Sequence, residues 1–198
     1  MDTVQNYITG LKKAYADSGA GEKWAHFERI AHGADRADIE KLRTAYPETP
    51  DCLIELLNYV DGTYHREYAG ERTALYFLGS DVEGYPYYLL SAEQMTEKED
   101  MEWLFDFVNR KFGDAVSIDE RITDNARGLC WLHFSDCMNN GGSSQLFIDF
   151  SPSSKGKKGQ IVRYLHDPDE LWVIADSFEE YLQKLMRWGY DFLSEVSL

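Results

Sequence analysis

The sequence predicts a single α+β domain in which a central, mostly antiparallel sheet is flanked by helices. Two observations lead to this prediction. The last third of the chain holds short apolar runs separated by turn-forming segments, and the first third repeats apolar residues at helical spacing. A strand meander followed by a packing helix is typical of the α+β class. The expected meander strands are residues 129–134, 145–150, 160–165 and 171–175.

The first third of the chain predicts four helices. Thr3 and Asp35 stand where a side chain can cap a helix start, and Thr49 does so before Pro50, a residue suited to the first helical position. Gly62 follows the fourth helix and can adopt the left-handed backbone with which many helices end. The apolar stripes that define these helices lie within residues 4–15, 24–30, 39–46 and 53–60.

The middle of the chain changes character. Residues 74–78 and 85–90 look like short strands, and Ser91 with Gln94 forms a capping box for a following helix. Residues 113–128 are expected to be an irregular connection. An amphipathic helix before it is predicted to bury the stripe formed by Met101, Leu104, Phe105, Val108 and Phe112.

The last predicted helix begins after Ser177. Ser177 and Glu180 have the spacing of a capping box, in which two free backbone N–H groups are satisfied reciprocally. This helix is expected to pack across one face of the sheet through Phe178, Tyr181, Leu182, Leu185 and Met186.

Length and composition favour one compact unit. The chain has 198 residues and five prolines, and no Pro/Gly-rich linker divides it. We expect residues 1–34 to form a helical extension and residues 35–198 to form the domain. No apolar run approaches the roughly 20 residues needed to span a bilayer, and no secretory signal is visible. The three cysteines are an odd number, which argues against a disulfide framework, so the expected location is the reducing cytoplasm.

The charge balance is strongly acidic. The chain has 20 Lys and Arg against 35 Asp and Glu, a formal net charge of −15. Such a surface repels phosphate backbones, which disfavours nucleic-acid binding. It favours faster encounter with a basic protein partner, but solubility alone is the preferred explanation of the charge until another feature supports a partner.

No residue pattern predicts a catalytic centre, a metal site or a cofactor. Cys130, His133 and Cys137 are ligand types that zinc prefers, but alternation along a strand places Cys130 and His133 on opposite faces, with the imidazole at a surface edge. His166 and Asp167 fit a turn better than a metal-dependent hydrolase site. The loop at residues 156–159 lacks the length and the Ser/Thr of a P-loop. We therefore expect a protein that is not an enzyme.

One segment combines tyrosines with acids. Seven of the 13 tyrosines fall between residues 59 and 88, interleaved with Asp and Glu. Tyrosine gives large contact area with little entropy to lose, so this segment is a candidate partner surface; the alternative is that several of these tyrosines line the core. The predicted contact residues are Asp61, Tyr64, Asp81, Tyr85 and Tyr87.

A series of motifs at residues 35–62 and 129–185 resembles the SUKH superfamily, also called the Smi/Knr family. The matching segments, in order, are Ile39-Glu40-Lys41-Leu42, Tyr46-Pro47, Leu53-Ile54-Glu55-Leu56-Leu57, Asp61-Gly62, Trp131-Leu132-His133-Phe134, Gly142 with Gln145-Leu146-Phe147-Ile148-Asp149, Gly156-Lys157-Lys158-Gly159, His166-Asp167-Pro168 and Ala175-Asp176-Ser177-Phe178-Glu179-Glu180. His133 stands where the family usually has proline, and residues 91–127 form a longer segment than the family norm. The resemblance implies a SUKH-like domain with a mostly antiparallel sheet.

The resemblance also implies a non-enzymatic role. Bacterial members of this superfamily are widely regarded as immunity proteins that neutralise toxin domains, often nucleases or deaminases, and fungal members act as scaffolds in cell-wall synthesis and signalling. Together with the acidic charge, this gives our first hypothesis, an immunity-type module that occludes a basic toxin domain. A regulatory scaffold is the second hypothesis, and a small-ligand binder or enzyme with a deep pocket is the third.

Overall fold

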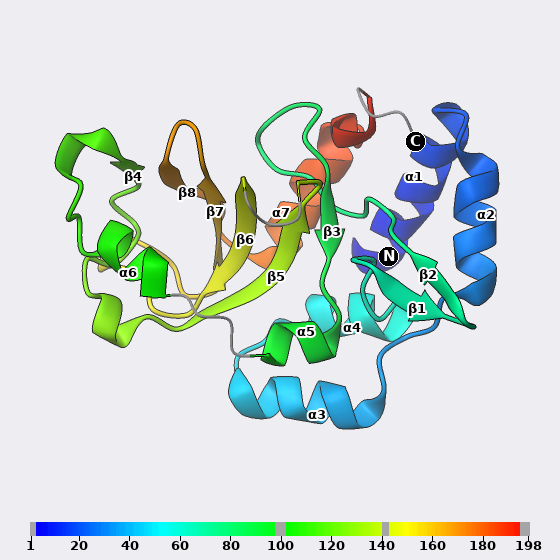
Figure 1. Ribbon diagram of the computed structural model, residues 1–198, viewed down its shortest axis with the longest axis horizontal. Helices are drawn as coiled ribbons and strands as arrows, with labels where there is room; N and C mark the ends of the chain where they lie inside the picture. Colours follow the sequence, from blue (N-terminus) through cyan, green and yellow to red (C-terminus); the bar gives the residue numbers. More distant parts are fainter. Residues whose placement is uncertain (1–2, 98–101, 140–142, 195–198) are drawn as a thin grey trace.

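The computed structural model describes residues 3–97, 102–139 and 143–194. Its helices surround a sheet, with α6 at the opposite end of the molecule from α1 and α2 (Figure 1). Within the described residues the α-helices are α1 (Thr3–Asp17), α2 (Gly21–Ile30), α3 (Arg36–Ala45), α4 (Asp51–Tyr59), α5 (Ala92–Thr96), α6 (Glu102–Val108) and α7 (Phe178–Arg187). Short 3-10 turns are η1 (Gly113–Ala115), η2 (Ala126–Gly128) and η3 (Asp191–Leu193).

The strands form a six-stranded mixed sheet and a small hairpin. The hairpin pairs β1 (Arg66–Tyr68) with β2 (Glu71–Thr73). The large sheet has the order β3-β5-β6-β7-β8-β4, and each neighbouring pair is antiparallel except β4 and β8, which are parallel. Its strands are β3 (Tyr87–Leu89), β4 (Ser117–Ile118), β5 (Trp131–Cys137), β6 (Ser144–Asp149), β7 (Gln160–Leu165) and β8 (Glu170–Ala175).

The sheet has two differently covered faces because successive side chains point to opposite sides. Leu146, Ile148 and Ile161 point to the side of α7, where they share the main core with α1, α4 and α7. We call this side the α7 face; α7 lies behind the sheet in Figure 1. Phe147 and Val162 point the other way and join a second core with Leu104 and Val108 of α6. We call this side the α6 face.

The structure confirms the predicted fold class and most of the expected elements. The four meander strands are β5 to β8, and β7 has the predicted bounds. The Ser91–Gln94 capping box is complete: Ser91 Oγ accepts from Gln94 N at 3.1 Å, and Gln94 Oε1 accepts from Ser91 N at 2.9 Å. At α7, Ser177 caps Glu180 N, but the Glu180 carboxylate accepts from Asp176 N instead of Ser177 N.

Two of the predicted helix caps are wrong. Thr3 lies inside α1, where its hydroxyl donates to Glu179 Oε1 at 2.8 Å. Thr49 donates its hydroxyl to the Tyr46 carbonyl, so Pro50 takes the N-cap position and α4 begins one residue later than predicted. Asp35 does hold the N-cap position of α3, although its side chain makes no capping hydrogen bond.

Two predictions for the middle of the chain are also wrong. Residues 74–78 are not a strand: the Leu75 and Phe77 amides bond to different segments, at Thr63 and Tyr87, so no ladder forms beyond an isolated bridge between Leu78 and Tyr87. Residues 113–128 are more regular than expected because they contain β4. The helical stripe is interrupted as well, since Phe105 and Phe112 are exposed; Met101 lies outside the described residues, as does Gly142.

The N-terminal helices share the main core with the sheet. Tyr7, Leu11 and Tyr15 of α1 are fully buried. The Tyr7 hydroxyl donates to the Phe77 carbonyl at 2.6 Å, and the Tyr15 hydroxyl donates to the Tyr76 carbonyl at 2.7 Å. Residues 3–34 therefore pack against the rest of the chain and bury part of its surface.

Candidate interaction surface

A straight row of side chains crosses the α6 face of the sheet. Strand register aligns Tyr88 of β3 with Asp136 of β5, Asp136 with Gln145 of β6, Gln145 with Tyr164 of β7, and Tyr164 with Leu171 of β8. The register shift after His133 is what brings Asp136, rather than Ser135, onto this face. The row therefore has an aromatic residue towards each end and polar groups between them.

The Tyr88 end of the row is built from the tyrosine-rich segment. The Tyr88 ring lies 5.2 Å from the Tyr64 ring and 5.0 Å from the Tyr76 ring, and His65 packs edge-on against Tyr64 at 5.0 Å. We call Tyr64, Tyr76 and Tyr88 the tyrosine cluster. Burial, with the neighbouring Tyr76 hydroxyl, raises the pKa of Tyr88, so the Tyr88 hydroxyl stays protonated at pH 7.

The centre of the row is a buried polar group of side chains. His133 Nε2 lies 3.1 Å from the Ser135 carbonyl oxygen and 3.2 Å from Asp136 Oδ1, so this nitrogen carries the proton. Gln145 Nε2 donates to the same carboxylate oxygen at 3.2 Å. The prediction of a surface-edge imidazole at His133 is wrong, because its ring is buried and packs on Phe147 at 5.1 Å.

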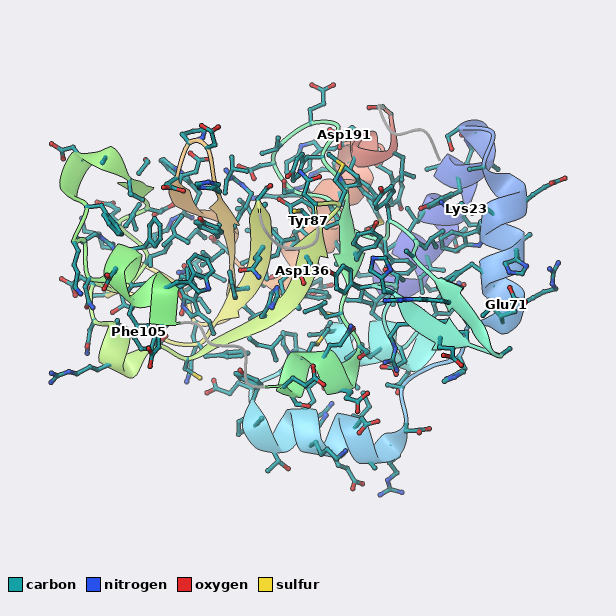
Figure 2. The ribbon with its side chains drawn as sticks, in the orientation of Figure 1. Lys23, Glu71, Tyr87, Phe105, Asp136 and Asp191 are labelled. Atoms are coloured by element: carbon teal, nitrogen blue, oxygen red, sulfur yellow. The ribbon has the colours of Figure 1, made fainter. Side chains whose placement is uncertain are left out.

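The Tyr164 end of the row supports α6. The Trp103 ring lies 4.6 Å from the Tyr164 ring, and Phe107 packs on both Tyr164, at 5.7 Å, and Phe112, at 5.0 Å. The Tyr164 hydroxyl reaches Asp169 Oδ1 at 3.4 Å. Figure 2 places Phe105 on this helix, far from Tyr87 and beyond Asp136. No signal in the sequence separated these partly exposed aromatics from core residues.

The structure separates the predicted contact residues. Tyr64 is half-buried on the α6 face, whereas Tyr85 and Tyr87 pack together at 5.7 Å on the other side of β3. Asp81 is exposed, and its carboxylate lies 2.5 Å from Nε of Arg163. Arg163 belongs to β7 and is buried on the α7 face. The predicted set therefore lies around the β3 edge of the sheet instead of on one face.

Two of the predicted contact residues have internal roles. Asp61 is buried; it pairs with Arg66 at 2.6 Å and accepts from the Ala92 amide at 3.0 Å, which ties the chain after α4 to the start of α5. Tyr87 is fully buried, and its hydroxyl bonds Ser144 Oγ at 2.6 Å. Neither side chain is on the folded surface, so the prediction of direct partner contact is corrected at these two positions.

A cavity of about 310 Å³ opens beside the polar row, between α5 and the beginning of β5. Burial raises the pKa of the Cys130 thiol there, which disfavours the reactive thiolate. Within the described ranges, no group of three or more His, Cys, Asp or Glu is placed to hold a metal ion, and no helix is long and apolar enough to cross a bilayer. The cavity is lined by Ala45, Tyr46, Gln94, Met95, Thr96, Glu97, Leu129, Cys130, Trp131 and His133.

The fold and this surface together define a single-domain α+β protein with a mixed sheet and an acidic, aromatic-bearing exterior. The model of the SMI1/KNR4 family (SUKH-1) matches residues 33–184, which is most of the chain. The chain belongs to the SMI1/KNR4 (SUKH-1) family, as its motifs predicted. No curated protein matches the chain significantly.

Proposed function

We propose that the chain is a non-enzymatic, cytoplasmic protein-binding module, an immunity protein that neutralises a basic toxin domain of nuclease or deaminase type. The observation that supports this most is the placing of part-exposed tyrosines and acids around the β3 edge of a chain with net charge −15. Its family membership agrees with this role. The acidic surface would cover the cleft with which the toxin holds its own substrate.

The contacts we propose are Tyr64, Asp81 and Tyr85. Tyr85 is already held in place, since its hydroxyl accepts from Asn139 Nδ2 at 3.2 Å and lies 3.7 Å from Cys137 Sγ. Arg163 fixes Asp81 through two hydrogen bonds, of 2.5 and 3.1 Å. Side chains that are ordered before binding lose less entropy in the complex, which favours affinity.

The test is neutralisation of a toxin encoded beside the gene for this chain. Co-expression of the wild-type chain should restore growth, and binding should weaken as NaCl is raised, because exposed charges are screened. Changing both Tyr64 and Tyr85 to alanine should lower affinity by roughly tenfold or more. Trp188→Ala is the control, because Trp188 is 40% exposed at the C-cap of α7.

The outcomes test the immunity role, the contact region and the importance of charge separately. Failure of the wild-type chain to bind or protect against the toxin would remove the immunity role. Full protection by the double variant would keep the role but exclude the β3 edge as the contact region. Binding that is insensitive to salt would favour the alternative of a regulatory scaffold.

A second candidate function, small-ligand binding, is favoured by the cavity beside His133. Its volume of about 310 Å³ is at the lower end of ordinary ligand sites. Screening metabolites by thermal shift tests this function: a ligand that raises the melting temperature of wild type but not of Cys130→Phe, which fills the opening, would support it.

A further inference from the structure

The aromatic side chains exposed at α6 form a second feature of the molecule. In the described part of the chain, the large apolar side chains with substantial exposure are Trp103, Phe105, Phe112, Trp172 and Trp188. Three of these five fall within ten residues of one another, on and just after α6. Clustering of exposed apolar groups, unlike single exposed residues, marks interaction sites.

The α6 aromatics are held rigidly by the sheet beneath them. Trp103 is 38% exposed, yet its ring lies only 4.6 Å from Tyr164 of β7. Phe112 is 47% exposed and rests against Phe107, which in turn packs on Tyr164. We define the α6 surface as Trp103, Phe112, Tyr164 and Asp169. Trp103 and Phe112 are its exposed rings, whereas Tyr164 is buried beneath them and supports Trp103 directly and Phe112 through Phe107.

Acidic groups border these rings. The carboxylate of Asp169 lies 3.4 Å from the Tyr164 hydroxyl, and the neighbouring Asp167 is exposed. Asp106 and Asp114 lie on α6 and η1, and Glu102 is at the start of α6. A ring face beside a carboxylate attracts a lysine or arginine side chain, because the ring quadrupole and the negative charge act in the same direction.

Three basic groups near the α6 surface are already engaged. Lys111 pairs with Asp106 at 2.5 Å, and His166 pairs with Asp169 at 2.6 Å. The Arg110 guanidinium is turned inward and donates to the backbone carbonyls of Val108, Ile122 and Thr123. Among the groups named here, five acids (Glu102, Asp106, Asp114, Asp167 and Asp169) outnumber three basic groups (Arg110, Lys111 and His166), which disfavours a phosphate backbone as the occupant.

We propose that the α6 surface is a docking site for a lysine- or arginine-bearing segment of a protein partner, separate from the β3 edge. The assignment rests on the proposed protein-binding function and extends it to the other end of the sheet. A basic side chain would lie over the Trp103 ring with its charge towards Asp169, while the Phe112 ring contacts its methylene chain.

The test uses a synthetic decapeptide of lysine, with ¹⁵N-labelled full-length chain, so that no toxin is required. The five indole N–H signals are assigned by single Trp→Phe substitutions. We expect the Trp103 signal to shift on titration, while those of Trp172 and Trp188, exposed to the same degree, stay in place. Phe112→Ala and Trp103→Ala should each weaken binding by about fivefold, and Asp169→Asn by a similar factor.

A control variant and three contrary results decide whether the peptide binds at the α6 surface. Trp188→Ala should leave the affinity unchanged within about twofold. Thermal melts accompany each variant, and Phe112→Ala is the one least able to disturb the fold because Phe112 lies outside α6 and is the most exposed. Equal shifts at Trp103, Trp172 and Trp188, or unchanged affinity in Phe112→Ala, would overturn the assignment. Self-association of the chain that Phe112→Ala abolishes, without peptide binding, would overturn it in favour of a second copy.

The two proposals fail separately. If the toxin is neutralised but the peptide does not shift the Trp103 indole signal, the immunity role is supported and the docking role of the α6 surface is excluded. If the peptide binds at Trp103 but no toxin is neutralised, the docking role is supported and the immunity role is excluded.

Discussion

Tyr85 and Tyr87 are two residues apart, yet they have different physical roles. Tyr87 is fully buried, and its hydroxyl must donate to Ser144 Oγ because Ser144 itself donates to the Tyr164 carbonyl. Tyr85 is half-buried, with its hydroxyl near the surface. A loss of binding after alanine substitution at both positions would therefore mix unfolding of the sheet with loss of a contact.

Substitution of the hydroxyl alone separates these roles. Tyr87→Phe should lower the free energy of unfolding by about 1 kcal/mol, because one buried hydrogen bond is lost while Ser144 keeps its bond to the Tyr164 carbonyl. Tyr85→Phe should change it by less than about 0.5 kcal/mol. Urea unfolding measures both. Equal stability of the Tyr87→Phe variant and wild type would contradict the proposed internal role of Tyr87.

His166 gives the surface beside Tyr164 a pH dependence. Its hydrogen bond and charge interaction with Asp169 raise the pKa of the imidazole above its ordinary value. A raised pKa in the folded state means that the pair stabilises the fold fully below the unfolded pKa, about 6.5, and that this contribution disappears as pH rises through the folded pKa. We expect the His166 Cε1 proton, followed by NMR, to titrate above that of the same residue in Asp169→Asn. Identical titration curves would show that the pair is absent in solution.

At the scale of elements, a side-chain pair adds to the backbone hydrogen bonds that join β4 to β8. Arg121 Nη2 donates to Asp119 Oδ2 at 2.6 Å and to the Val173 carbonyl at 3.0 Å, while the Asp119 amide donates to the Leu171 carbonyl at 2.9 Å. Burial works against ionisation of Asp119, but the hydrogen bonds from Arg121 outweigh it and lower the pKa of the carboxyl. The pair therefore attaches the two-residue strand to β8.

Removing this charge should release β4. Asp119→Asn should lower the free energy of unfolding by about 1–2 kcal/mol, at the low end for a charged hydrogen bond because Arg121 remains partly solvated. Hydrogen exchange at the Asp119 and Val173 amides should become faster. Glu120→Gln is the matched control, since Glu120 pairs with Lys155 at the exposed surface and should change stability little. Unchanged exchange in Asp119→Asn would mean that backbone pairing alone holds β4.

The elements that sequence could predict are those fixed by local chemistry. The capping box of Ser91 and the bounds of β7 depend on neighbouring residues, and both are confirmed. β4 could not be predicted, because two residues carry no periodicity and their parallel partner is some fifty positions away. The predicted contact residues lie on different sides of the sheet for a similar reason: the sides of Tyr64 and Tyr85 depend on how their segments pack beside β3, and the face of Asp136 depends on the irregularity after His133. Exposure of Phe112 could not be predicted either, because α6 ends at Val108 and the helical spacing no longer applies at Phe112.

At the scale of the whole molecule, the net charge acts over long distances, whereas the core stabilises the fold through direct contacts. The acidic excess is spread along the chain, and it would speed encounter with the basic partner that we propose through long-range attraction. The core is continuous instead: α1, α2, α4, α7 and the α7 face of the sheet belong to one cluster of buried residues. The family match begins at residue 33, so α1 and α2 lie outside it while sharing its core.

Because the core is continuous, we predict that a core substitution in α1 also destabilises the centre of the sheet. Leu11 is fully buried, so Leu11→Ala should lower the free energy of unfolding by about 2–5 kcal/mol. If the chain unfolds as one unit, the amides of β6, which pair with β5 and β7, should exchange faster by the factor that corresponds to this loss, at least about thirtyfold. Lys13→Ala, on the same helix but at an exposed position, should leave β6 exchange unchanged. Faster exchange confined to α1 and α2 in Leu11→Ala would show that residues 1–34 unfold independently, as a separate extension would.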